Sequence, residues 1–84
     1  MYKQKRVPQY MQKMQDQASL WLWASESAVE DAIANKYFAA AETGYYALKY
    51  SVDAYKHLGL VADPASMERK LKEFRRRIYA LKGV

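Results

Sequence analysis

Apolar residues near the carboxyl end of the chain recur with the period of a helix. Their intervals are four, three, four and three residues, which places all of them on one side of a helix. The members of this row are Met67, Leu71, Phe74, Ile78 and Leu81. Asp63 can cap free amides, Pro64 suits the first helical position, and Gly83 suits a helix end. The pattern predicts a helix over residues 64–82.

The middle of the chain carries two parallel rows at helical spacing. One row is mostly large and apolar and consists of Phe38, Ala41, Tyr45, Leu48, Val52 and Tyr55. The other contains only small residues, which are Ala40, Gly44, Ala47, Ser51 and Ala54. Because small side chains let another helix backbone come close, the two rows predict a helix covered on two sides, as at the centre of a bundle. Gly59 can take the left-handed conformation after this helix, with Leu60 folding back against its last turn.

The amino-terminal half gives weaker boundaries. Its first apolar residues at helical spacing are Met11, Met14, Ala18, Trp21 and Leu22. Ser27 followed by Glu30 resembles a capping box, whereas the apolar row continues past these residues without a change of phase. A single helix over residues 9–58 would be far longer than the usual ~10–14 residues. This favours a break near residues 24–27, with Gly44 as a second candidate.

We therefore predict an all-α fold, a small three- or four-helix bundle with a long central helix, which oligomerisation could complete. The expected helices span about residues 9–24, 27–58 and 64–82. Residues 1–8 are expected to form a basic N-terminal arm, and residues 9–84 a single helical domain. The chain has 84 residues, of which 51% are hydrophobic, and this suits one domain with a modest core.

Charge is segregated along the chain, which has a formal net charge of +5. Residues 1–14 hold four bases and no acid, residues 15–35 hold four acids and no base, and residues 64–84 hold seven bases and two acids. Such segregation can steer a polyanion towards the protein. It can equally pair the basic ends with the acidic middle of the same subunit or of a neighbouring one.

The chain has no cysteine, which excludes a disulfide framework and a thiolate metal site. Its first residues lack the apolar segment of a signal peptide. Its longest apolar stretch, residues 18–24, is far shorter than the ~20 residues that span a bilayer. We expect a cytoplasmic protein.

Residues that could carry out chemistry are few. The only histidine, His57, is placed in the last turn of a predicted helix, where a cation favours the helix dipole. Glu26 and Glu30 lie one helical turn apart, but no Glu-x-x-His motif accompanies them. The three glycines are too isolated for a nucleotide-binding loop. We predict no catalytic residue, no metal ligand and no cofactor, and therefore a protein that is not an enzyme.

The predicted last helix carries a basic face on the side away from its apolar row. Its members are Arg69, Lys72 and Arg76, with Arg75 and Arg77 flanking them. Cations on a rigid face can neutralise phosphates or meet an acidic patch on a protein. The same residues could equally form an ordinary solvated surface, in which Glu73 and Arg77 pair across one turn.

Aromatic residues are the second candidate binding feature. The chain has eight tyrosines, and those of the middle segment spread around most of a helix, so some must reach the surface or an interface. Trp21 and Trp23 project about 200° apart, at about 100° per residue, so one core cannot easily cover both. The candidate interface anchors are Trp21, Trp23, Tyr46 and Tyr50. Filling the volume of a small core would explain the aromatic residues equally well.

The leading hypothesis is a non-enzymatic helical interaction module that binds and modulates a partner protein. It would be a homo-oligomeric regulatory or accessory protein, and a nucleic-acid-handling protein would be one such partner. The aromatic anchors would supply contact area, and the basic face would supply electrostatic complementarity. The alternative is direct, sequence-independent binding of DNA or RNA through the basic last helix.

Overall fold

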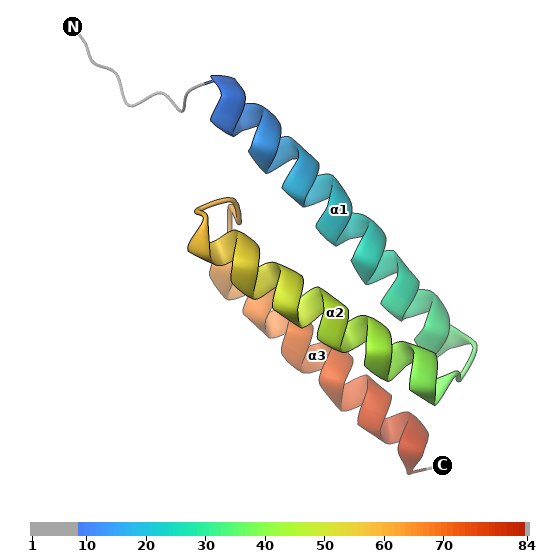
Figure 1. Ribbon diagram of the computed structural model, residues 1–84. Helices are drawn as coiled ribbons and strands as arrows, with labels where there is room; N and C mark the ends of the chain where they lie inside the picture. The colour runs from blue at the N-terminus through green and yellow to red at the C-terminus, as the bar shows by residue number, and fades with distance from the viewer. Residues whose placement is uncertain (1–8, 84) are drawn as a thin grey trace, which may run out of the picture.

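The computed structural model describes residues 9–83, which fold into three helices, each antiparallel to the next (Figure 1). These are α1 (Gln9–Ala34), α2 (Phe38–His57) and α3 (Pro64–Lys82). The chain is a small all-α bundle, as predicted. The central helix α2, with 20 residues, is shorter than the predicted helix over residues 27–58, because residues 27–34 belong to α1, which has 26 residues. The predicted arm, residues 1–8, lies outside the described residues.

α1 runs without interruption through residues 24–27, so the break predicted there is wrong. Ser27 lies inside the helix, and one row of buried residues continues past it. This row is Ala18, Leu22, Val29, Ala32 and Ile33. A side-chain cap contributes about 1 kcal/mol, whereas burial of a Val or Ile side chain contributes roughly 1.5–3 kcal/mol. Continued burial against α2 therefore outweighs the local capping signal.

The chain leaves α1 at Lys36, whose backbone φ is 61°. This is the left-handed region, which residues other than Gly rarely adopt. The Lys36 N–H donates to the Ile33 carbonyl at 3.0 Å, and the next N–H, of Tyr37, donates to the Ala32 carbonyl at 2.9 Å. The two bonds form a Schellman motif, which satisfies two carbonyls of the last turn. The break between the first two helices is therefore at residues 35–37.

α2 ends with the same motif, built here on Gly59 as predicted. The φ of Gly59 is 73°, and its N–H donates to the Lys56 carbonyl at 3.0 Å. The Leu60 N–H donates to the Tyr55 carbonyl at 2.8 Å. Leu60 itself is buried, which adds the apolar contact that often accompanies this type of helix end.

α3 begins where the sequence predicts. A side-chain oxygen of Asp63 accepts a hydrogen bond from the Ser66 N–H at 3.1 Å, and Pro64 occupies the first turn. The buried residues of α3 are Leu71, Phe74 and Ile78. The predicted helix over residues 64–82 is confirmed, including its buried side.

The core lies where α2 meets both of its neighbours. Its largest fully buried side chains are Val29 from α1, Leu48 and Val52 from α2, and Phe74 from α3. A Cβ added at Gly44 would lie 3.2 Å from Cγ2 of Val29. Gly44 therefore allows α1 to come close to α2, and the prediction of a possible break there is wrong.

The row of small residues on α2 is only partly covered. Gly44 and Ser51 are half-buried, whereas Ala40, Ala47 and Ala54 are exposed. α2 is covered on two sides, by α1 and by α3, as predicted, but most of the row of small residues lies beneath neither helix. One side of the α1–α2 pair is left open.

Two ion pairs join α1 to α3. The ammonium of Lys70 lies 2.9 Å from Oε1 of Glu26, and the guanidinium of Arg77 lies 2.9 Å from Oε1 of Glu30. Acids of the middle segment thus meet bases of the last helix within one molecule. This is one of the two pairings that the charge segregation allowed.

Candidate functional site

The described residues offer no cluster suited to metal binding. Within residues 9–83, no group of three or more His, Asp or Glu side chains could hold a metal ion. His57 is exposed in the last turn of α2, where a cationic side chain favours the helix dipole. In the same part of the chain, no helix is long and apolar enough to cross a membrane. Candidate sites are therefore sought among the exposed faces.

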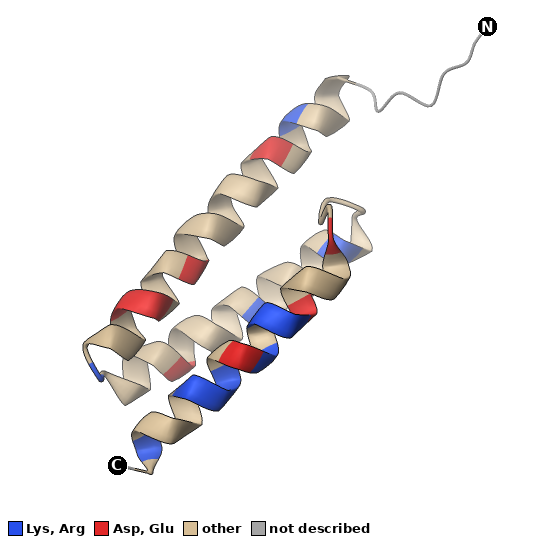
Figure 2. Ribbon diagram, turned by 180° about the vertical axis from the view of Figure 1, so that it is seen from behind, with Lys and Arg blue, Asp and Glu red and all other residues tan. Residues whose placement is uncertain are grey.

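Two of the five residues predicted to form the basic face are engaged in ion pairs. Figure 2 shows basic segments along the outer side of α3, with acidic segments between them. Arg76 pairs with Glu73, and Arg77, which is half-buried, pairs with Glu30 on α1. The alternative Glu73–Arg77 pair is not formed. Arg77 thus has a clear structural role in holding α1 to α3.

The other three members of the predicted basic face are Arg69, Lys72 and Arg75, which are exposed. None of them forms an ion pair with another residue between 9 and 83. The guanidinium of Arg75 lies 5.6 Å from the centre of the Tyr79 ring, a cation–π distance. These three cations are the part of the face that is available to an anionic partner.

Tyr46 lies on the side of α2 next to α3, and Tyr50 lies one turn further along α2. Their rings stack with centroids 6.4 Å apart and an interplanar angle of 28°. Tyr46 also lines a small hollow with Arg75 and Tyr79, and the charge interaction with Tyr79, followed by desolvation, raises the pKa of Tyr46. Tyr46 therefore borders the basic face, and both of these predicted anchors are separate from the tryptophans.

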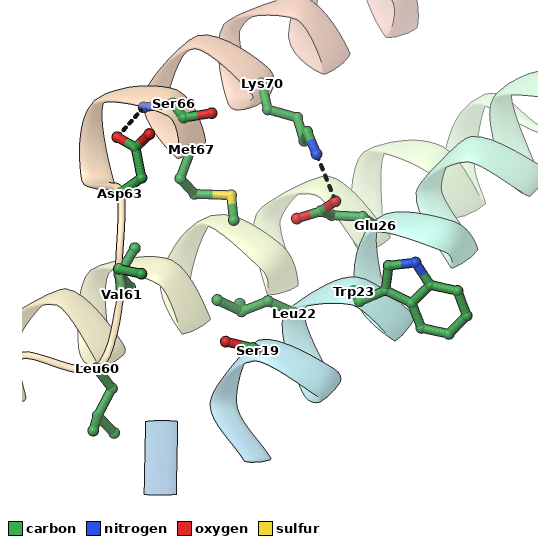
Figure 3. A pocket seen from close by; sticks show the side chains of 11 residues that line it. Ser19, Leu22, Trp23, Glu26, Leu60, Val61, Asp63, Ser66, Met67 and Lys70 are labelled. Atoms are coloured by element: carbon green, nitrogen blue, oxygen red, sulfur yellow. Dashed lines mark hydrogen bonds and ion pairs between the residues drawn. The ribbon is translucent and has the colours of Figure 1, made fainter. Parts of the chain in front are cut away.

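A groove of about 250 Å³ runs between α1 and the start of α3 (Figure 3). Leu22 and Met67 point into it, and the Glu26–Lys70 ion pair bridges its two walls. Trp23 lies at its edge, with the indole directed away from the groove and 64% exposed. Glu26 and Lys70 neutralise each other, and the third charged residue of the lining, Asp63, caps α3. The groove therefore has little to hold a charged ligand.

The side of the α1–α2 pair that faces away from α3 is uncharged and mostly apolar. We name it the hairpin face. Its members are Tyr10, Met14, Gln17, Trp21, Ala24 and Ala28 on α1 and Ala40, Gly44, Ala47, Ser51, Ala54 and Leu58 on α2. At about 100° per residue, Ala28 projects about 160° away from Glu30, which pairs with α3. Ala54 lies about 160° around α2 from Lys56, which also pairs with α3.

Trp21 lies near the middle of the α1 row and is 58% exposed. It lines a surface hollow of about 330 Å³ that Met14 from α1 and Leu58 from α2 also line. Figure 2 shows no charged segment on α1 between Asp16 and Glu26. Both tryptophans are exposed, and on different sides of α1, which agrees with the predicted divergence of their directions.

Two parts of the hairpin face were already apparent in the sequence, but not as one face: Trp21 was a predicted anchor, and the small row on α2 was predicted to lie against another helix. The sequence contains a signal for this face. The α1 row and the α2 row share the spacing four, three, four, three, four, and neither row contains a charged residue.

Comparisons of the chain with protein-family models, with curated proteins and with solved structures find no significant match. The function must therefore be argued from the chemistry of the exposed faces.

Proposed function

We propose that this chain is a non-enzymatic helical interaction module that binds and modulates a partner protein through the hairpin face. The observation that carries the proposal is an exposed tryptophan, Trp21, at the middle of a face without charge. Charged side chains keep most protein surfaces hydrated, and contiguous apolar patches on a monomer commonly mark an interaction site.

The size of the gain supports this assignment. A tryptophan buries roughly 150–250 Å² when covered, so shielding the exposed half of Trp21 is worth roughly 2–3 kcal/mol at about 25 cal/mol per Å². Met14 and Leu58, exposed on the same face, add to this. Central tryptophans surrounded by such contacts are typical binding hot spots.

A photo-cross-linking amino acid at position 21 tests the proposal. Position 23 is the matched control, because Trp23 is equally exposed but lies on another side of α1. In extracts of the native host, irradiation should give discrete protein adducts from position 21 and few from position 23. Equal labelling at both positions, or none at position 21, would contradict the proposal.

Direct, sequence-independent binding of nucleic acid is the second candidate function. It is favoured by the three cations of α3 that have no ion pair among residues 9–83, namely Arg69, Lys72 and Arg75. The aromatic rings of Tyr46 and Tyr79 lie beside Arg75. Proteins that bind single strands combine aromatic rings, on which bases stack, with cations that neutralise the phosphates.

Electrophoretic mobility shifts of labelled single and double strands at low salt test this second function. Changing Arg69 and Lys72 to Ala should weaken binding and reduce its salt dependence, because each lost phosphate contact lowers the number of released counterions. Changing Lys13 and Lys36 to Ala removes the same charge away from α3 and should have less effect. Equal losses in both double variants would exclude α3 as the site.

A further inference from the structure

The hairpin face consists of two complementary rows. Its α1 row includes the large side chains of Tyr10, Met14 and Trp21, all exposed. Its α2 row is made of Gly, Ala and Ser until it reaches Leu58. One row therefore carries large exposed side chains, whereas the neighbouring row offers only small ones as far as Ala54.

We propose that a second copy of this chain covers the hairpin face, related by a two-fold axis parallel to the helices. This inference rests on the proposed function and names the partner of that same face. In this arrangement α1 of each copy packs antiparallel on α2 of the other copy. The two α1–α2 pairs form a four-helix bundle, with each α3 on the outside.

The largest side chain of the face, Trp21, lies opposite small side chains of the other copy in this bundle. A two-fold axis parallel to the helices keeps every residue at its own height. Gly44 opposite Val29 fixes the register of α1 and α2, so Trp21, eight residues before Val29, lies at the height of about Ser51 and Ala54. The indole of one copy therefore meets the small side chains of the other. A two-fold axis that lies in the interface but runs perpendicular to the helices would instead place the α1 rows of the two copies against each other.

Charge also favours a second copy over an unrelated charged partner. With a net charge of +5, two copies repel each other wherever their bases meet. The hairpin face contains no base, and two cations of α3, Lys70 and Arg77, pair with Glu26 and Glu30 on another side of α1. An acidic or basic partner would meet no opposite charge on this face. A second uncharged face can pack against it without any ion pair.

The dimensions suit a weak, reversible dimer. With Gly44 opposite Val29, the α1 row of one copy meets the α2 row of the other over residues 15–28 and 45–58, which is about 20 Å at about 1.5 Å per residue. Two adjacent helices are about 20 Å wide. The projected contact is therefore roughly 400 Å² per copy, about 800 Å² in total, which is less than most stable interfaces bury, so we expect dissociation in the micromolar range.

Sedimentation velocity of the full chain tests the inference. The wild type should sediment at twice the chain mass of 9.8 kDa at high micromolar concentration. Trp21→Glu and Ala47→Glu should each raise the dissociation constant by a factor of 100 or more, because each places an unpaired charge in the interface. Trp23→Glu adds the same charge outside the hairpin face and should leave the dissociation constant unchanged. Far-UV circular dichroism checks that each variant is folded.

Cysteine cross-linking tests the symmetry, since the chain has no cysteine of its own. Ala24→Cys and Ala47→Cys chains, mixed and oxidised, should form the disulfide between the two different variants faster than either variant alone forms a dimer. Faster linkage of identical variants would overturn the two-fold axis proposed here. A wild type that stays monomeric at about 100 µM would overturn the dimer, yet foreign adducts at position 21 would still support the proposed function.

Discussion

Replacing Lys36 by Gly should stabilise the fold, although the change adds backbone freedom to the unfolded chain. A left-handed backbone such as that of Lys36, with φ of 61°, costs a residue with a Cβ roughly 1–2 kcal/mol. Gly escapes this cost but loses about 0.5–1 kcal/mol more in backbone entropy on folding. The exposed side chain of Lys36 forms no ion pair with another described residue. The expected gain is therefore about 0.5–1 kcal/mol.

Gly59 supplies the matched control, because it ends α2 with the same pair of hydrogen bonds. Its φ is 73°, and a Cβ added there would meet no atom within 4 Å. The cost of Gly59→Ala is thus conformational and should be about 1 kcal/mol. The two substitutions act on equivalent positions of two helix ends and should change stability in opposite directions.

Thermal and urea unfolding, followed by far-UV circular dichroism, would measure both changes. Protein concentration must be held constant, because self-association adds to the apparent stability. For a domain of this size, Lys36→Gly should raise Tm by roughly 2–6 °C, and Gly59→Ala should lower it by a similar amount. A fall in Tm for Lys36→Gly would show that the left-handed residue is not Lys36 and that α1 ends elsewhere.

Three further changes probe the core, a helix cap and an ion pair. Phe74→Ala removes a fully buried ring and should lower the free energy of unfolding by about 3–5 kcal/mol, which is close to the whole stability of so small a domain. A variant that still unfolds cooperatively near the wild-type Tm would contradict this prediction. Tyr37 is the N-cap residue of α2 but forms no side-chain hydrogen bond there. Because an aspartate can supply that bond, Tyr37→Asp should raise the free energy of unfolding, measured with urea, by about 1 kcal/mol. The pair with Lys56 lowers the pKa of Glu68 and raises that of Lys56. The ion pair stabilises the fold above the pKa of the glutamate in the unfolded chain, and this stabilisation is lost as pH falls through the lower pKa of folded Glu68. The Tm of Glu68→Gln should therefore change less with acid pH than the Tm of the wild type. Identical plots of Tm against pH for the two proteins would exclude the pair.

The third helix could be predicted in full because its signals are local. The cap of Asp63, the position of Pro64 and the spacing of the apolar row all act within the segment itself. The end of α2 was predictable for the same reason, since Gly59 is the residue that a left-handed position favours. No contact with another helix was needed to recognise either boundary.

The end of α1 carried no comparable signal. A lysine occupies the left-handed position there, and the accompanying side-chain bond, from Asn35 to the carbonyl of Asp31 at 2.8 Å, is a weak marker. The capping-box pattern at Ser27 was stronger locally but was overruled by burial of Val29 and its neighbours against α2. Similarly, the basic residues of α3 could be named from the sequence, whereas the pairing of Arg77 with Glu30 joins residues 47 positions apart.

The uncovered side of α1 depends on a competition that the sequence alone did not decide. α1 has one apolar row through Leu22 and Val29 and another through Trp21, and tryptophan is the largest side chain of the two rows. If single side chains decided which row is buried, the large apolar side chain of Trp21 would favour burial of its own row. The row of Leu22 is buried instead because it stays aliphatic as far as Ile33, whereas the row of Trp21 ends in alanines. The aliphatic side chains that the row of Leu22 buries along α2 together contribute more than one indole could, and the fold therefore leaves Trp21 exposed.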